Sequence, residues 1–193
     1  MQAGPLCCVV LLVIATCGGE SPPADEVPVA EGTGAALALD EIVRDLAAAE
    51  SKLMSLAEAL SEEQYNWRPA DGVRSSGEVF MHVASVNYAF PMLTGADVPS
   101  GVSMSLEEFF PSIAAYEATA EGKDEILAAL RLSFEHLRNA VNTSSTDLDR
   151  ELDVFGMPSS VRGFWWVHLG HVHEHLGQLI AYARSNGVAP PWS

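Results

Sequence analysis

The chain has 193 residues, 48% of them hydrophobic, which is enough for one domain with a well-developed core. Its 26 acidic and 10 basic residues give a formal net charge of −16. This balance excludes nucleic-acid binding as a main function, because neutralising phosphates needs clustered Lys and Arg, and it opposes polybasic attachment to anionic lipid. We interpret the excess acid as a well-solvated surface.

The N-terminal segment has the pattern of an export signal. Residues 6–16 form an apolar run, LCCVVLLVIAT, which is too short to span a bilayer but has the length of a signal-peptide core. The following Cys17 lies in a stretch, IATCG, that resembles a bacterial lipobox, although no Lys or Arg precedes the run. We therefore predict a signal peptide over residues 1–17, lipidation of Cys17 and a lipid-anchored protein of the cell envelope. An ordinary secretory signal and an uncleaved hydrophobic anchor are the alternatives.

The cysteines and the next segment agree with this interpretation. Cys7, Cys8 and Cys17 all belong to the leader, so the chain after it has no disulfide and no thiolate to serve as nucleophile or metal ligand. Residues 18–36 are rich in Pro, Gly, Ala and acid and lack a periodic apolar pattern, which is typical of a flexible linker. The predicted domain occupies residues 37–193.

Two helices are predicted in the first half of this domain. Apolar residues spaced three and four apart form one seam along the first helix: Leu39, Ile42, Leu46, Ala49, Leu53, Leu56 and Leu60. The second helix opens with a capping box, in which Ser75 and Glu78 satisfy each other's backbone N–H groups, and it stops at Pro91 and Gly95. Its seam consists of Val79, Val83, Val86 and Phe90.

Two more helices follow in the second half. The third carries Leu127, Leu130, Phe134, Leu137 and Val141. The fourth carries Trp165, Leu169, Val172, Leu176, Leu179 and Ala183, and Gly187 and Pro190-Pro191 end it. No strand-like alternation is sustained anywhere. Four helices with near-heptad seams pack best at small crossing angles, which predicts an all-α fold, a four-helix bundle.

The long connection between the second and third helices, residues 94–121, is harder to interpret. Phe109, Phe110, Ile113 and Tyr116 have helical spacing and could form a short helix over one mouth of the bundle. We favour a packed loop without a functional role.

Four histidines gather on the fourth helix. His168, His171 and His175 fall on one strip together with Gln178, whereas His173 points to the far side and is expected to be exposed. Because His171 and His175 are one turn apart, they can present two imidazoles to one ion. Such a pair alone is weak evidence, since solvated or hydrogen-bonded histidines occur at the same spacing.

A solitary histidine on the second helix strengthens the case for a metal. His82 borders the apolar seam, where a polar ring without a partner would cost stability. A metal ion would satisfy this ring, and so would a buried hydrogen bond. If the bundle brings His82 to His171 and His175, three neutral nitrogens can hold one divalent ion and leave coordination positions open, as reactive sites require. We predict this three-histidine metal site.

Other polar residues are secondary candidates. Glu78, one turn before His82, could accept a hydrogen bond from the ligand's other ring nitrogen or act as a general base, but we favour capping as its role. His168 could be a fourth ligand or a neighbour that receives a proton. His136 lies off the third helix's seam and is interpreted as a surface residue. No catalytic serine triad, phosphate loop or dinucleotide motif competes with the histidines.

Residues 37–193 resemble the DinB/YfiT-like superfamily of metal-binding four-helix bundles. The resemblance rests on Trp67-Arg-Pro69, on the helix opening from Ser75 to His82, and on His171-x-x-x-His175-x-Gly-Gln178 with a trailing Arg184, Gly187 and Pro190-Pro191. The family's metal-binding histidines correspond to His82, His171 and His175. The family often has Trp-Ser where this chain has Arg74-Ser75, so the mouth of the site is expected to differ.

The resemblance also implies chemistry. It implies a bundle that is often dimeric and binds zinc, nickel or another divalent ion. Characterised relatives include transferases and isomerases that use low-molecular-weight thiols such as bacillithiol or mycothiol, which are mainly cytosolic, whereas this chain carries an export pattern.

Three hypotheses follow from the sequence. The first is a metal-dependent hydrolase or thiol-dependent transferase of the cell envelope with an unknown small-molecule substrate. The second is a non-catalytic metal- or ligand-binding lipoprotein. The third is an interaction module without metal, which predicts that replacing His175 with Ala changes little.

Overall fold

The computed structural model describes residues 33–193, so the predictions for the signal peptide, for Cys17 and for most of the linker lie outside the described residues. The six α-helices of this part of the chain are α1 (Thr33–Ala59), α2 (Glu62–Asn66), α3 (Ser76–Ala89), α4 (Phe109–Glu117), α5 (Lys123–Thr143) and α6 (Val161–Ser185). Helix α1 begins inside the end of the segment predicted as linker. Within residues 33–193, no helix is both long and apolar enough to cross a membrane.

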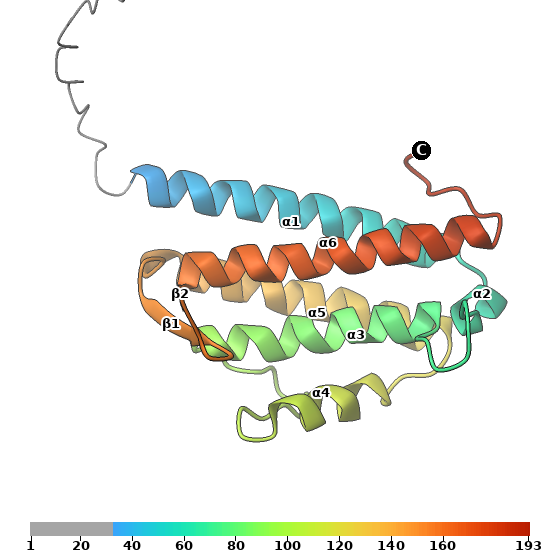
Figure 1. Ribbon diagram of the computed structural model, residues 1–193, viewed down its shortest axis with the longest axis horizontal. Coiled ribbons are helices and arrows are strands. Elements are labelled where there is room, and N and C mark those ends of the chain that lie inside the picture. The colour runs from blue at the N-terminus through green and yellow to red at the C-terminus, as the bar shows by residue number, and fades with distance from the viewer. Residues whose placement is uncertain (1–32) are drawn as a thin grey trace, which may run out of the picture.

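Four long helices, α1, α3, α5 and α6, form the bundle (Figure 1). The most extensive contacts join α3 to α5 and α1 to α6, whereas α3 and α6 touch each other less. Helix α4 lies outside the bundle and packs along α3. This arrangement confirms the predicted helical fold, a four-helix bundle.

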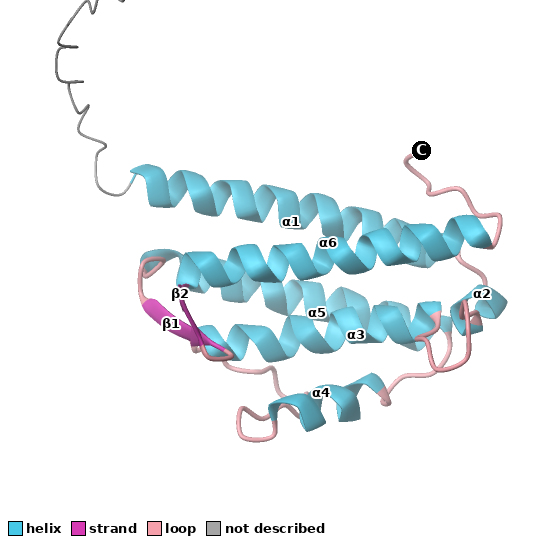
Figure 2. Ribbon diagram, viewed as in Figure 1, coloured by secondary structure: helices cyan, strands magenta, loops and turns pink. Residues whose placement is uncertain are grey.

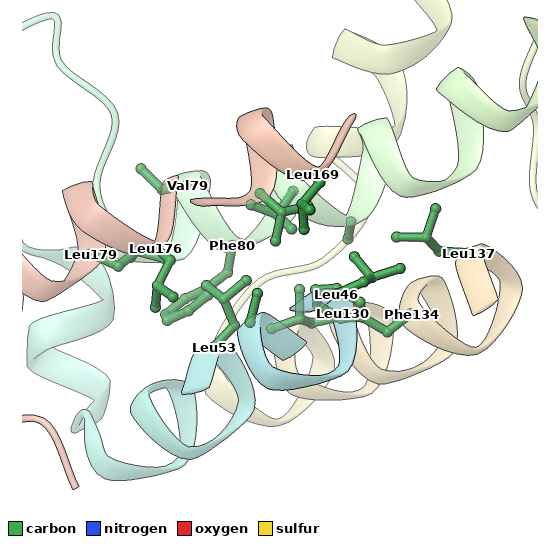
Figure 3. Close-up of a cluster of buried hydrophobic side chains, with 14 of the residues drawn as sticks. Leu46, Leu53, Val79, Phe80, Leu130, Phe134, Leu137, Leu169, Leu176 and Leu179 are labelled. Carbon is green, nitrogen blue, oxygen red and sulfur yellow. The ribbon is translucent and has the colours of Figure 1, made fainter. Parts of the chain in front are cut away.

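The predicted seams form the core of the bundle. Each of the four long helices turns its apolar strip inward, and the side chains meet between the helices (Figure 3). The labelled residues of this cluster are Leu46, Leu53, Val79, Phe80, Leu130, Phe134, Leu137, Leu169, Leu176 and Leu179. Because burying one such side chain stabilises a fold by about 1.5–3 kcal/mol, the seam residues suffice to define the helix packing.

The ends of α3 follow the predicted signals. The Ser75 backbone N–H donates to Glu78 Oε2 at 2.6 Å, and the Glu78 N–H donates to Ser75 Oγ at 3.2 Å, which completes the capping box. After Ala89 the chain tightens into a 3₁₀ helix, η1 (Phe90–Thr94), which ends at Gly95 with a φ of 92°. A residue with a side chain would be strained in that left-handed conformation.

The connection between α3 and α5 contains a helix, so our preference for a loop was wrong. Phe109 and Ile113 of α4 are buried against Ala89 of α3, and this contact stabilises a helix of only nine residues. A helix of nine residues is marginal by itself, whereas Pro111 is tolerated because it lies in the first turn. Packing against α3 decides the conformation.

A β-hairpin that the sequence analysis did not predict precedes α6 (Figure 2). Strands β1 (Glu151–Val154) and β2 (Met157–Ser160) pair in antiparallel register, following a second short 3₁₀ helix, η2 (Ser144–Thr146). The two turn residues, Phe155 and Gly156, have φ angles of 55° and 84°, as in a type I′ turn. The usual sequence signal for this turn is Asn-Gly or Asp-Gly, so the pair Phe-Gly does not predict a hairpin.

Candidate metal centre

The bundle brings the three predicted histidines together across the α3–α6 interface. His82 lies in the middle of α3, and His171 and His175 lie on successive turns of α6. The Nε2 atom of His171 is 3.2 Å from that of His82 and 3.1 Å from that of His175. Each residue offers one ligand atom, and these three atoms lie within 4.8 Å of one another.

These separations fit one divalent ion. Two imidazole nitrogens at about 2.0–2.1 Å from a tetrahedral zinc ion would be about 3.3–3.4 Å apart. Where two ring nitrogens face each other through lone pairs they repel, and a bound cation would remove that repulsion. The three-histidine cluster could therefore bind a metal ion with little rearrangement. Imidazole suits zinc, nickel, copper and iron alike, so the donor set does not identify the metal.

Two of the three rings are held in the tautomer that ligation requires. The Nδ1–H of His82 donates to Glu117 Oε1 at 2.6 Å, and the Nδ1–H of His175 donates to Gln178 Oε1 at 2.9 Å. The amide of Gln178 is oriented in turn because its Nε2 donates to the Tyr182 hydroxyl at 2.9 Å. With the proton on Nδ1, each Nε2 keeps a lone pair directed at the cluster.

His171 is fixed by packing rather than by a hydrogen bond. Its Nδ1 atom is buried and has no partner within residues 33–193. Burial, followed by the charge that His175 would carry, lowers the pKa of His171 to about 2. Burial also lowers the pKa of His175, with the hydrogen bond to Gln178 acting in the opposite direction. Both rings are thus neutral at pH 7, as metal ligands must be.

Glu117, at the end of α4, is the residue that the sequence analysis missed. Its Oε1 accepts the hydrogen bond from His82, and its Oε2 lies 3.4 Å from an Arg74 guanidinium nitrogen. Burial raises the pKa of Glu117, but the hydrogen bond from His82 and the charge of Arg74 outweigh it, so the pKa is lowered. The carboxylate is therefore ionised and strengthens the electron donation of the His82 ring. The helical spacing of Phe109, Ile113 and Tyr116 was the available signal for this helix.

Known proteins resemble this chain in sequence and in fold. The family model described as the DinB superfamily matches residues 45–179. The chain belongs to the DinB superfamily. No curated protein matches this DinB chain.

Two solved structures resemble the DinB fold described above. A DinB-like protein from Bacillus cereus ATCC 10987 is 17% identical, with a TM-score of 0.64 over 79% of this chain and 95% of that one. A DinB-like protein from Bacillus subtilis is 20% identical, with a TM-score of 0.56 over 76% of this chain and 92% of that one. At these identities the likeness supports the fold alone.

Glu78 does not contact the histidine cluster of this DinB domain. It caps α3 and accepts a hydrogen bond from Arg68 at 2.9 Å. That hydrogen bond is the largest contribution to the lowered pKa of Glu78. The structure thus gives Glu78 the capping role that we favoured and assigns the contact with the His82 ring to Glu117.

The other histidines lie outside the three-histidine group. His168 is 1% exposed, and its Nε2 is 3.2 Å from Asn87 Oδ1, so this nitrogen is engaged away from the cluster. His173 is exposed as expected and pairs with Asp45 at 3.1 Å. Our interpretation of His136 as a surface residue was wrong. Its ring is half-buried and packs against the ring of Tyr88, with the two centroids 5.2 Å apart.

A pocket of about 520 Å³ opens near the N-terminal end of α3. Glu117 and Glu78 line it together with Arg68 and Ser75, above an apolar floor that includes Met81. The lining of this pocket includes Glu117, the residue that orients His82, and none of the three histidines.

Proposed function

We propose that this DinB protein binds a divalent metal ion through His82, His171 and His175 and uses it for hydrolysis or thiol-dependent group transfer. One observation carries the proposal: three imidazole Nε2 atoms converge, and hydrogen bonds at Nδ1 orient two of the rings. Histidines that only fill a core are also hydrogen-bonded, but they have no need to bring three ring nitrogens within 4.8 Å of one another. Three protein ligands leave a coordination position for water or substrate.

The chain's own residues set the chemistry of such a site. When bound, a divalent ion would lower the pKa of a water or thiol or polarise a carbonyl group. Glu117 would hold the Nδ1 proton of His82, and Arg74 would keep the Glu117 carboxylate ionised. Because no cysteine follows Cys17, a transferred or activated thiol would have to come from another molecule.

A non-catalytic metal- or ligand-binding role is the second candidate. The observation in its favour is that the 520 Å³ pocket is lined by Glu117 and by none of the three histidines. In this role the ion would join α3 to α6 and stabilise the bundle by mass action.

Metal analysis tests the proposal directly. The full chain, made without a metal-binding tag, is analysed by elemental mass spectrometry beside the His82→Ala and His171→Ala variants. His173→Ala is the matched control, because His173 belongs to the same helix but is exposed and lies outside the cluster. We expect near-stoichiometric zinc or nickel in the wild type and the control and loss of metal in the other two variants.

Two other outcomes would contradict the proposed function in whole or in part. A folded wild type that stays metal-free after reconstitution with zinc and with nickel would exclude the metal site and leave an interaction module. Bound metal without turnover of ester, amide or thiol-acceptor substrates would favour the non-catalytic candidate.

We further propose that the protein works in the cell envelope. This rests on the apolar run before Cys17 and on the lipobox-like sequence around it. Cell fractionation of the wild type and of Cys17→Ala tests this location. Lipidation predicts that the wild type is in the membrane fraction, labelled by palmitate, and that the variant loses the label.

A further inference from the structure

An exposed group of aromatic rings lies at the C-terminal end of α3. We define this aromatic surface by three residues: Phe90 of η1, Phe110 of α4 and Phe155 of the hairpin turn. Phe110 is 66% and Phe155 is 49% exposed, and their rings stack with centroids 5.7 Å apart. The Phe155 ring is also 5.8 Å from that of Phe90. Three separate segments of the chain thus contribute rings to one surface.

One ring of the aromatic surface contacts the candidate metal centre. The Phe90 ring lies 5.8 Å from the ring of His171, a predicted ligand. Along α3, all residues between His82 and Phe90 are buried, while these two side chains reach solvent in part. On α6, Val167 precedes His171 by one turn and is 50% exposed. From Phe155 the rings lead to His171 through Phe90, in two steps of 5.8 Å between ring centroids.

The conformation of Phe155 supports a binding role for this surface. Among the described residues it is the one non-glycine residue with a positive φ, at 55°. A left-handed conformation costs a bulky residue of order 1–3 kcal/mol, and such strain is concentrated at functional sites. Here the strained turn presents a half-exposed phenyl ring to solvent next to Phe110 instead of the Asn that would fit the turn without strain.

We propose that the aromatic surface binds the apolar, ring-bearing part of a small-molecule ligand whose polar group reaches the metal ion. The proposal rests on the proposed function, because it gives the substrate class of the same centre. Stacking between aromatic rings adds to the hydrophobic gain of covering exposed phenyl groups, so a ligand with rings would be preferred over one without. The contact from Phe90 to His171 makes such a ligand more fitting than a partner that covers the rings alone.

A graded series of metal-directed probes tests this inference. Acetohydroxamate, benzohydroxamate and 4-phenylbenzohydroxamate share one metal-chelating group and differ by successive rings. Their dissociation constants are measured on the cobalt-loaded full chain from the change in the visible spectrum. We expect each added ring to tighten binding to the wild type, by about tenfold over the whole series.

Two variants and a control make the test specific. Phe155→Ala and Phe110→Ala should remove most of the preference for rings while leaving the affinity for acetohydroxamate unchanged. Leu132→Ala is the control, because Leu132 is a comparably exposed apolar residue, at 57%, on α5. It should keep the full preference.

Failure of this inference can be distinguished from failure of the proposed function. Equal affinity of the wild type for all three probes, or a preference that survives both Phe variants, would overturn the inference while the metal site stands. A chain that binds no cobalt would overturn the proposed function and this inference together.

Discussion

At the scale of single residues, the candidate metal centre depends on the groups that contact its histidines as well as on the three histidines themselves. His82 and His175 are each oriented through Nδ1, by Glu117 and by Gln178. His171 has no such partner within the described residues and is oriented by the side chains around it. The three ligands should therefore respond differently to substitution of their neighbours.

Replacing Glu117 with Gln should weaken metal binding about 10–100-fold, because the neutral amide supports the His82 ring less well than a carboxylate. Competition with a chromophoric chelator measures the change. Glu121→Gln is the control, since Glu121 lines the same pocket but does not contact a histidine. Equal zinc affinity in the two variants would contradict the role of Glu117.

Replacing Glu78 with Ala should affect folding and not metal binding. The substitution removes half of the capping box of α3 and should lower the free energy of unfolding by about 1 kcal/mol. Urea denaturation measures the stability, and chelator competition measures the zinc affinity. A large loss of zinc affinity with unchanged stability would instead restore Glu78 as a residue of the site.

At the scale of elements, the long amphipathic helices were predictable and the short ones were not. Each long helix carries an apolar seam several turns long, and the Ser75–Glu78 cap marked the start of α3. Helix α4 is held by contacts with α3, which lies well before it in the sequence, and local patterns do not encode such contacts. The strands of the hairpin contact chiefly each other, but their Phe155-Gly156 turn lacks the usual sequence signal. Glu117 belongs to α4. Because we predicted a loop there, we did not identify Glu117 as the residue that orients His82.

The docking of α4 on α3 should control the metal affinity from a distance. Ile113 is 7% exposed in the α3–α4 contact and does not touch a histidine. Ile113→Ala should loosen α4 and lower zinc affinity, by no more than the 10–100-fold expected for loss of Glu117.

A double-mutant cycle checks this coupling. In the Glu117→Gln background, Ile113→Ala should cost little further zinc affinity, because both substitutions break the same contact. Fully additive losses would show that Ile113 acts by another route.

At the scale of the whole molecule, buried neutral histidines link stability to pH. Burial lowers the pKa of His168 to about 3 and is the main cause that lowers the pKa of His171 to about 2, from an ordinary value of 6.5. Below pH 6.5 the unfolded chain thus binds more protons than the folded one. Folding stability is complete above this pH and is lost as the pH falls.

The metal-free protein should lose roughly 1.4 kcal/mol of unfolding free energy per pH unit below pH 6.5 for each of these two histidines. Urea denaturation at successive pH values between 7 and 5, in the presence of a chelator, gives the slope. His168→Asn should reduce the slope by roughly 1.4 kcal/mol per pH unit, whereas His173→Asn, at an exposed position, should leave it unchanged. A stability that is flat over this range would contradict the buried neutral state.

The position of α4 outside the bundle has a consequence for how this chain can change. The bundle helices α3 and α6 supply all three imidazoles, whereas the carboxylate that orients His82 comes from α4, which lies outside the bundle. If the cluster binds an ion, substitutions in α4 could alter the reactivity of that ion while the ligand set persists. For protein engineering, this makes α4 the natural segment to randomise when a new activity is sought on an unchanged bundle.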